Sequence, residues 1–230
     1  MNNIKQRFTN IKLQIRQAET SAGRNIDSVQ LLAVSKTKPA RDVAIAYQTG
    51  QRHFAESYLQ EALTKQQALS GFNISWHFIG PIQSNKTKHI AASFNWVHSV
   101  DRLKIAKRLS EQRPAYLPDL NICLQVNISN EQSKSGVTLE GLSQLINEVN
   151  ELPNIRLRGV MAIPEPETDF EAQREPYRLL YQAVKQFNMP QLDTFSFGMT
   201  GDLTAAIAEG STIVRIGSAL FGARSYQKTA

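Results

Sequence analysis

The chain has 230 residues, of which 41% are hydrophobic and 20% charged, which is typical of one globular domain over residues 1–230 and excludes a disordered or fibrous chain. The net charge of +6 raises nucleic acid as a partner, but the lysines and arginines are scattered, so we do not expect nucleic-acid binding. No apolar run approaches the ~18 residues that cross a bilayer, and the lone Cys123 cannot form an intrachain disulfide, so we expect a cytoplasmic protein without a membrane segment.

The chain begins with a predicted amphipathic helix. Apolar residues share one helical face, and the polar residues between them exclude a signal peptide; they are Ile4, Phe8, Ile11, Leu13 and Ile15. Eight short apolar runs with the character of β-strands follow. These runs cover residues 31–35, 52–56, 76–80, 95–100, 121–128, 155–163, 194–199 and 212–217.

Segments of helical periodicity separate the eight runs. The clearest span residues 40–49, 101–112, 138–152 and 177–187, and Asp101 and Thr138 are candidate N-caps. Eight alternating βα units predict an α/β fold whose parallel sheet closes into a (β/α)8 TIM barrel, with the first helix as an addition. A doubly wound open sheet is the competing fold. The turn after the first run reads KTKP, however, and the chain contains no G-x-G-x-x-G.

Ligands of such barrels bind where the strands end, so the last residues of the eight runs are candidate site residues. Lys36 is the most informative, because it directly follows an apolar run, where desolvation depresses a lysine pKa and leaves a nucleophilic amine. Such an amine forms a Schiff base with an aldehyde. The alternative is a lysine that extends from the barrel mouth into water. The other candidates are Glu56, Gly80, Ser99, Asn127, Met161, Met199–Thr200 and Arg215–Gly217.

Two glycine-containing turns near the end of the chain are candidate phosphate sites. FGMTGDL at 197–203 and VRIGSALFG at 214–222 each lead from a run into a helix, where free N–H groups attract phosphate. Ordinary turn chemistry is the alternative. An aldehyde at Lys36 and a phosphate at the turns together indicate pyridoxal 5′-phosphate (PLP), with Arg215 facing the ring nitrogen. Sugar phosphates are the other candidate ligands, and Arg215 could instead pair with Glu56 or Asp202.

Six motifs from Leu31 to Arg224 closely resemble the YggS family of pyridoxal phosphate homeostasis proteins. They are VSKTKP at 34–39, HFIGPIQSNK at 77–86, VHSVDR at 97–102, NISNEQSKSG at 127–136, RGVMAIP at 158–164 and GMTGDLTAAIAEGSTIVRIGSALFGAR at 198–224. The resemblance implies a barrel akin to the N-terminal barrel of alanine racemase, a PLP fold-type III barrel without the second β-domain.

The resemblance also implies roles for particular residues. Lys36 would carry PLP as a Schiff base and Arg215 would meet the pyridine nitrogen. Thr200, which stands where the family more often has serine, would hold the phosphate with Gly217 and Ser218, and Met199 and Ile216 would lie alongside. Ala55 and Ser57 replace the glycine and asparagine of the family's usual GENYVQE, so the family's asparagine near the cofactor is missing here.

We expect a protein that binds PLP reversibly and buffers its concentration, rather than an enzyme. A racemase needs two acid–base groups, and the resembling racemases take the second from a dimer with an extra β-domain. An arginine at the ring nitrogen also weakens the ring as an electron sink. The alternative is a slow PLP-dependent racemase or lyase. PLP-dependent apoenzymes are candidate recipients of the cofactor, and a monomer is favoured. Lys134 and the Lys86–Lys88 cluster are candidate sites for partners or a second PLP molecule; the alternative is that they are ordinary surface lysines.

Overall fold

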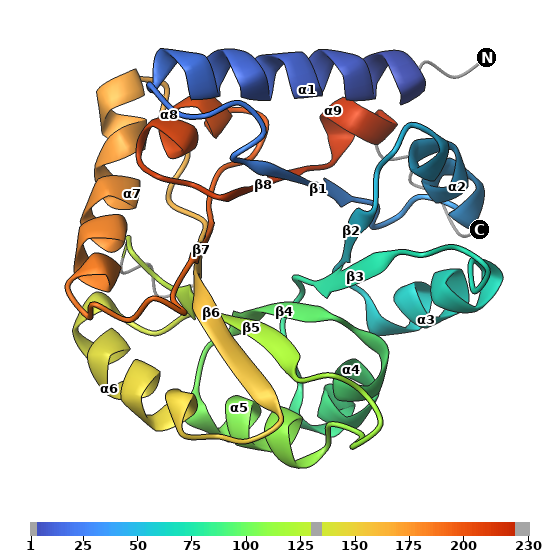
Figure 1. Ribbon diagram of the computed structural model, residues 1–230, viewed down its shortest axis with the longest axis vertical. Coiled ribbons are helices and arrows are strands. Elements are labelled where there is room, and N and C mark those ends of the chain that lie inside the picture. Colours follow the sequence, from blue (N-terminus) through green and yellow to red (C-terminus); the bar gives the residue numbers. More distant parts are fainter. Residues whose placement is uncertain (1–3, 130–134, 224–230) are drawn as a thin grey trace, which may run out of the picture.

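Eight parallel strands close into a barrel in the computed structural model, which describes residues 4–129 and 135–223 (Figure 1). The strands pair in chain order, and β8 returns to pair with β1, so that Ala33 lies opposite Ile216. The predicted (β/α)8 barrel is therefore confirmed, with a strand in each predicted run. The strands are β1 (Gln30–Val34), β2 (His53–Glu56), β3 (Ser75–Phe78), β4 (Trp96–Val100), β5 (Leu120–Val126), β6 (Ile155–Ala162), β7 (Thr194–Ser196) and β8 (Ile213–Ile216).

Helices surround the barrel. The last two helices are short, and the first helix covers the part of the barrel that they leave open. They are α1 (Ile4–Ser21), α2 (Ala40–Gln48), α3 (Leu59–Ala68), the 3-10 turn η1 (Ser84–Lys86), α4 (Thr87–Ser93), α5 (Leu103–Glu111), α6 (Leu139–Asn150), α7 (Phe170–Lys185), α8 (Leu203–Ala208) and α9 (Ser218–Phe221). Helix α1 packs on α8 and α9 outside β8 and β1 (Figure 1). Phe8 of α1 meets Phe221 of α9 edge to face, with ring centroids 5.8 Å apart.

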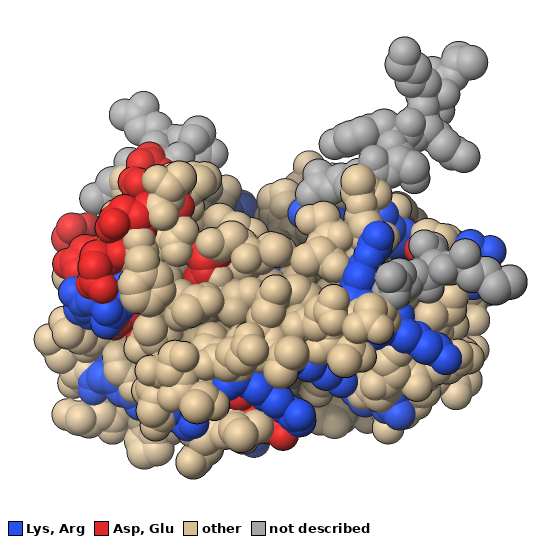
Figure 2. Space-filling view, turned by 90° about the horizontal axis from the view of Figure 1, so that it is seen from above, with Lys and Arg blue, Asp and Glu red and all other residues tan. Residues whose placement is uncertain are grey.

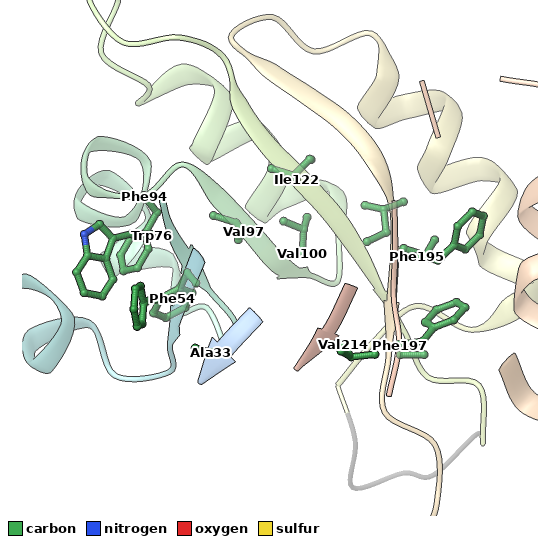
Figure 3. Close-up of a cluster of buried hydrophobic side chains, with 14 of the residues drawn as sticks. Ala33, Phe54, Trp76, Phe94, Val97, Val100, Ile122, Phe195, Phe197 and Val214 are labelled. Carbon is green, nitrogen blue, oxygen red and sulfur yellow. The ribbon is translucent and has the colours of Figure 1, made fainter. Parts of the chain in front are cut away.

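The main hydrophobic core lies between the strands and the helices. Side chains alternate along each strand, so one set points outward and joins this core (Figure 3). Phe54, Trp76, Phe195 and Phe197 are among its large members. Inside the barrel the apolar cluster is small and consists of Leu32, Val34, Ala55 and Ile213. Much of the remaining interior is polar, with His77, His98, Ser196 and Arg215 all buried.

Helix α7 begins seven residues before the start predicted at Tyr177. The side chain of Asp169 accepts a hydrogen bond from the Ala172 N–H at 2.9 Å and caps the helix, which then continues through Pro176. Proline normally indicates a helix break, because it lacks the N–H that bonds to the preceding turn. The cap and the later turns compensate for the one missing hydrogen bond here.

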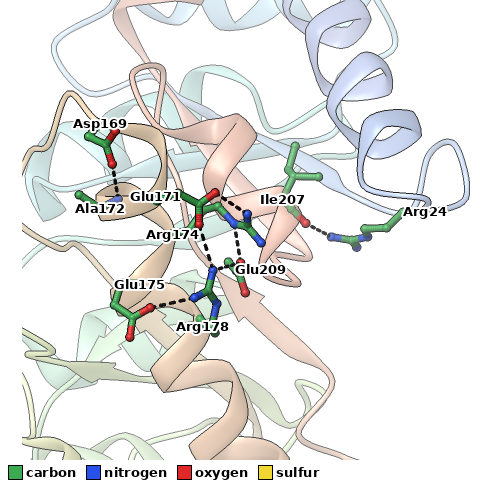
Figure 4. A network of polar contacts seen from close by, with 9 residues as sticks. All are labelled: Arg24, Asp169, Glu171, Ala172, Arg174, Glu175, Arg178, Ile207 and Glu209. Carbon is green, nitrogen blue, oxygen red and sulfur yellow. Dashed lines mark hydrogen bonds and ion pairs between the residues drawn. The ribbon is translucent and has the colours of Figure 1, made fainter.

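An ion-pair network joins α7 to the turn after α8 (Figure 4). Arg174 and Arg178 both contact Glu209 Oε1, at 2.6 Å and 3.3 Å, and each also pairs with Glu171. Arg24, which follows α1, donates to the Ile207 carbonyl at 3.0 Å. The three helices α1, α7 and α8 are thereby tied together beside β7 and β8.

Two local predictions are wrong and one is confirmed. Asp101 is not an N-cap, because Arg102 occupies that position of α5 and binds both Asp101 carboxylate oxygens at 2.7 Å instead. Leu13 was expected on the buried face of α1 but is 55% exposed. Thr138 does cap α6, since its hydroxyl accepts from the Gly141 N–H at 3.2 Å.

Candidate functional site

Lys36 lies at the barrel mouth, two residues beyond the end of β1, and is half-buried. The preceding residue still belongs to the sheet, because the Ser35 N–H donates to the Ala55 carbonyl of β2 at 3.0 Å. Strand β1 pairs with β2 on one side and β8 on the other. The lysine is therefore carried by a rigid strand end between two others, which agrees with the position that its sequence context predicts.

A buried ion cluster outside β1 and β2 holds the residue before Lys36. The Lys65 ammonium group of α3 donates to the Ser35 carbonyl and to Glu56 Oε1, both at 2.7 Å. The Ser35 hydroxyl donates to the same Glu56 oxygen at 2.6 Å. Burial raises the pKa of Glu56, with Lys65 and Ser35 opposing the rise. Glu56 was a strand-end candidate for the site, but its side chain lies on the outer side of the sheet and binds Lys65 and Ser35 there.

The same cluster holds the residue after Lys36. Glu61 Oε1 accepts from the Lys65 ammonium group and from the Thr37 N–H, each at 2.6 Å. Thr37 has a φ of 64°, a left-handed conformation that is uncommon outside glycine. The backbone on both sides of Lys36 is therefore fixed by one buried cation, which orients the strand end. The i, i+4 spacing of Glu61 and Lys65 is a sequence signal for one ion pair of this cluster, but it does not indicate the contacts with Ser35, Glu56 and Thr37.

The turn after β7 presents unpaired backbone donors. Asp202 fixes its shape, because its Oδ1 accepts from the Met199 N–H at 2.6 Å and its Oδ2 from the Tyr177 hydroxyl at 2.6 Å. Met199 and Thr200 are exposed, and within residues 4–129 and 135–223 the N–H groups of Thr200 and Gly201 have no acceptor. This turn can therefore bind an anion through its backbone, as predicted for a phosphate.

The turn after β8 presents a second pair of donors beside β1. Gly217 packs against Val34, the last residue of β1. In the part of the chain that the structure describes, no acceptor meets the N–H groups of Ser218 and Ala219. Ile216 is fully buried in the outer core, so it can offer only its backbone to the mouth. Since β8 lies between β7 and β1, both turns and Lys36 share one side of the barrel rim.

Arg215 occupies the barrel interior below these turns and is 4% exposed. Its Nη1 donates to the carbonyl of Ser196 and, at 3.0 Å, to the hydroxyl of the same residue; Nη2 donates to the Ala162 carbonyl at 2.9 Å. The alternative ion pairs with Glu56 or Asp202 are absent among the described contacts, because those carboxylates bind Lys65 and Tyr177. Burial lowers the pKa of Arg215, although Tyr177 and Asp202 oppose the shift.

The other strand-end candidates lie across the mouth from Lys36. Ser99 and Asn127 line a cavity of about 240 Å³ together with Ile79, Gln125 and Ile163. The Ser99 hydroxyl donates to the Gly80 carbonyl at 2.5 Å, and Met161 is buried. The cavity lies at the ends of β4 and β5, which are separated along the closed sheet from β8 and β1. Lys134, a candidate for a second site, lies outside the described residues.

Comparison with known proteins identifies the family. The model for the N-terminal domain of alanine racemase matches residues 8–225. A protein of Pseudomonas aeruginosa named pyridoxal phosphate homeostasis protein is 57% identical over 98% of both chains, and one of Escherichia coli with the same name is 49% identical over 99% of this chain and 100% of that one. The chain belongs to the YggS family. The solved structure of PipY from Synechococcus elongatus with PLP bound has a TM-score of 0.78 and 34% identity over 90% of this chain and 100% of that one.

The surface of this YggS-family chain carries charges of both signs. On the face in Figure 2, lysines and arginines are spread over the surface and acidic side chains gather toward one edge. Lys88 is exposed on α4, and Lys86 is half-buried. None of the described helices has the length and apolar character needed to cross a membrane.

Proposed function

We propose that residues 1–230 form a single cytoplasmic PLP-binding barrel that holds the cofactor reversibly as a Schiff base on Lys36. The observation that carries the proposal is the placement of Lys36 at the end of β1, above a buried Arg215 and beside two turns whose N–H groups have no acceptor among the described residues. The PLP bound in the PipY relative supports the same ligand. The Lys36 amine matches the aldehyde of PLP, the backbone N–H groups of the two turns match its phosphate, and the Arg215 guanidinium matches its ring nitrogen.

Each residue has a defined task in this proposal. Lys36 would hold PLP by condensing with its aldehyde, so that a C=N bond replaces the C=O bond and the oxygen leaves as water. Thr200, Gly217 and Ser218 bind the phosphate, largely through backbone N–H groups, with Met199 and Ile216 alongside. Arg215 would face the ring nitrogen and, being a cation, would oppose a proton on that nitrogen. Because water and competing amines reach the open mouth, the bond to Lys36 is reversible.

We infer a homeostatic rather than a catalytic role. When bound, PLP supplies an electron sink, and that sink is strong only if the ring nitrogen is protonated, which Arg215 opposes. The relatives in Pseudomonas aeruginosa and Escherichia coli carry the name of homeostasis proteins, not of enzymes. The chain would buffer free PLP as a monomer and release it to PLP-dependent apoenzymes. A slow racemase or lyase is the alternative, and α-proton exchange of amino acids in heavy water with the holo-protein would demonstrate it.

Substitution of Lys36 tests the proposal most directly. We expect Lys36→Ala to lose the visible absorption band of the bound cofactor while keeping its fold by circular dichroism, because Lys36 is at the mouth and outside the core. Borohydride reduction followed by peptide mapping should place the cofactor on Lys36 in the unmodified chain. The matched control is Lys107→Ala on the exposed face of α5, which should bind normally. An adduct on another lysine, or an unchanged band in Lys36→Ala, would refute the assignment.

A further inference from the structure

Three histidines form a line of hydrogen bonds across the barrel interior. His53 Nδ1 is 3.1 Å from His77 Nε2, and His77 Nδ1 is 2.9 Å from His98 Nε2. His98 Nδ1 is in turn 2.9 Å from the Ser196 hydroxyl, which accepts from Arg215. The line therefore joins neighbouring strands β2, β3 and β4 to β7 and β8 on the opposite side of the barrel. We call these three histidines and Ser196 the histidine relay.

The inner histidines of the relay and its end at His53 lie in different surroundings. His77 and His98 have no exposed surface, and the His77 ring stacks on Trp96 with centroids 5.5 Å apart. His53 is half-buried and lines a cavity of about 300 Å³ at the start of β1 and β2, on the face opposite Lys36. The relay thus spans the barrel from this cavity to the guanidinium group of Arg215.

Burial favours the neutral form of all three relay histidines and lowers the pKa of His53 as well. Burial holds the pKa of His77 well below its usual value, and burial together with Arg215 lowers the pKa of His98 to about 3. The charged and titratable groups that face them are one another and Arg215, which all oppose a second proton on either ring. Among the described residues, no group of three or more His, Cys, Asp and Glu side chains is arranged to hold a metal ion.

The arginine decides which way the hydrogens of the relay point. A guanidinium group only donates, so the Ser196 oxygen must accept from Arg215. Among the described residues, the one remaining partner of that hydroxyl is His98 Nδ1, so the buried hydroxyl hydrogen is satisfied only when Nδ1 accepts it. A neutral imidazole that accepts at Nδ1 donates at Nε2. The same reasoning at His77 and His53 puts the hydrogen of each ring on Nε2, away from Arg215, with the Ser75 hydroxyl at 3.4 Å as a second neighbour of His77 Nε2.

This polarity matters because Arg215 is buried without a carboxylate in hydrogen-bonding contact among the described residues. With every hydrogen pointing away from the arginine, the lone pair of each relay member points toward it. The relay then acts as a chain of aligned dipoles whose negative ends face the buried cation. The Ser196 carbonyl and hydroxyl fix the guanidinium orientation directly, and His98 fixes the hydroxyl.

We propose that His53, His77, His98 and Ser196 are positioning residues that orient Arg215 and stabilise its charge where it meets the PLP ring nitrogen. This role rests on the proposed function, since it concerns the same arginine. None of the four needs to touch the cofactor. They act through Arg215 from the opposite side of the barrel, and the aligned hydrogens predict one tautomer for all three rings.

The first test reads the tautomers in the full chain without cofactor. Histidine-selective ¹⁵N labelling and long-range ¹H–¹⁵N NMR at neutral pH report which ring nitrogen carries the proton. Of the four histidines, the exposed His89 is the internal reference. We expect His53, His77 and His98 to be protonated on Nε2 alone. A proton on Nδ1 of any of the three would overturn the proposal, whether or not the chain binds PLP.

The second test asks whether the acceptor at position 98 controls PLP binding. His98→Asn keeps an acceptor for Ser196, whereas His98→Leu removes it. We expect His98→Leu to bind PLP about tenfold more weakly and to shift the absorption maximum of the bound cofactor, and His98→Asn to stay within about threefold of the unmodified chain. Unchanged affinity in His98→Leu, or an equal loss in both variants, would overturn the positioning role. If His98→Leu does not fold, the tautomer measurement decides.

The two tests also separate this inference from the proposed function. If the unmodified chain fails to bind PLP but all three rings carry the Nε2 proton, the proposed function fails and the relay polarity stands. If the chain binds PLP through Lys36 but a relay ring carries its proton on Nδ1, the positioning role fails and the proposed function stands.

Discussion

At the scale of single residues, the site depends on side chains that never reach the mouth. The place of Lys36 at a strand end could be predicted from the sequence because the residue follows an apolar run, and that signal is local. The roles of His77 and His98 could not, because their partners lie on other elements that only the closed barrel brings together. For Lys65, the spacing from Glu61 indicates an ion pair, but its contacts with Ser35 and Glu56 come only from the closed barrel. A lysine within a helix and a histidine within a strand have the same local pattern whether they are buried or solvated.

The Lys65 cluster gives a prediction at this scale. Lys65→Met would leave Glu56 buried without its cation, which destabilises a fold by about 3–5 kcal/mol. Because Ser35 and Thr37 also lose their support, we expect weaker PLP binding as well. Denaturant unfolding and a PLP titration measure the two effects. The matched control is Lys88→Met, because Lys88 is exposed on α4. Equal stability of the two variants would contradict the role assigned to the cluster.

At the scale of elements, all eight strands were predictable because each is a short apolar run between turn residues. Helix α7 was predicted only in part, because the residue type that usually ends a helix, Pro176, lies within it. The cap at Asp169 was the missing signal. The role of α1 was also beyond sequence, since nothing local shows that α8 and α9 leave a sector of the barrel uncovered.

One buried and one exposed position of α1 test the role of this helix. Phe8→Ala removes a buried ring that packs on α9, and we expect it to cost about 3–5 kcal/mol of the free energy of unfolding. Leu13→Ala, on the exposed side of the same helix, should change that energy by less than about 0.5 kcal/mol. Urea unfolding monitored by tryptophan fluorescence compares them. Similar losses in both variants would mean that α1 is not held by its inner face.

Helix caps give a second matched pair at the scale of elements. Asp169→Ala removes the side chain that accepts from the Ala172 N–H, and we expect a loss of about 1 kcal/mol. Asp101→Ala changes a residue that resembles a cap in the sequence but does not act as one, so its effect should be near zero. Thermal unfolding distinguishes the two. A larger loss at Asp101 would restore the sequence-based assignment of that cap.

At the scale of the whole molecule, the barrel combines an apolar outer layer with a polar interior. The outer core between strands and helices makes the closed sheet stable, which allows the interior to bury Arg215 and neutral histidines at the same time. The mouth then carries Lys36 and the two turns, and the opposite face carries the cavity beside His53. Stability and ligand binding are therefore linked through the buried polar groups, and pH is the variable that reveals the link.

The buried histidines predict how stability depends on pH. In the unfolded chain a histidine binds its proton near pH 6.5, whereas folding lowers the pKa of His98 to about 3. Between these values the unfolded state holds more protons, so stability falls as pH falls. We expect each fully buried histidine to contribute a loss of about 1.4 kcal/mol per pH unit below pH 6.5.

Urea unfolding at several pH values between 7 and 5 measures this slope. His98→Asn removes one titrating group, so its unfolding free energy should decline less steeply with falling pH than that of the unmodified chain. A substitution at the exposed His89, such as His89→Asn, is the control and should leave the slope unchanged. Parallel slopes for the unmodified chain and His98→Asn would show that His98 is already protonated in the folded state, and the neutral relay would then be wrong.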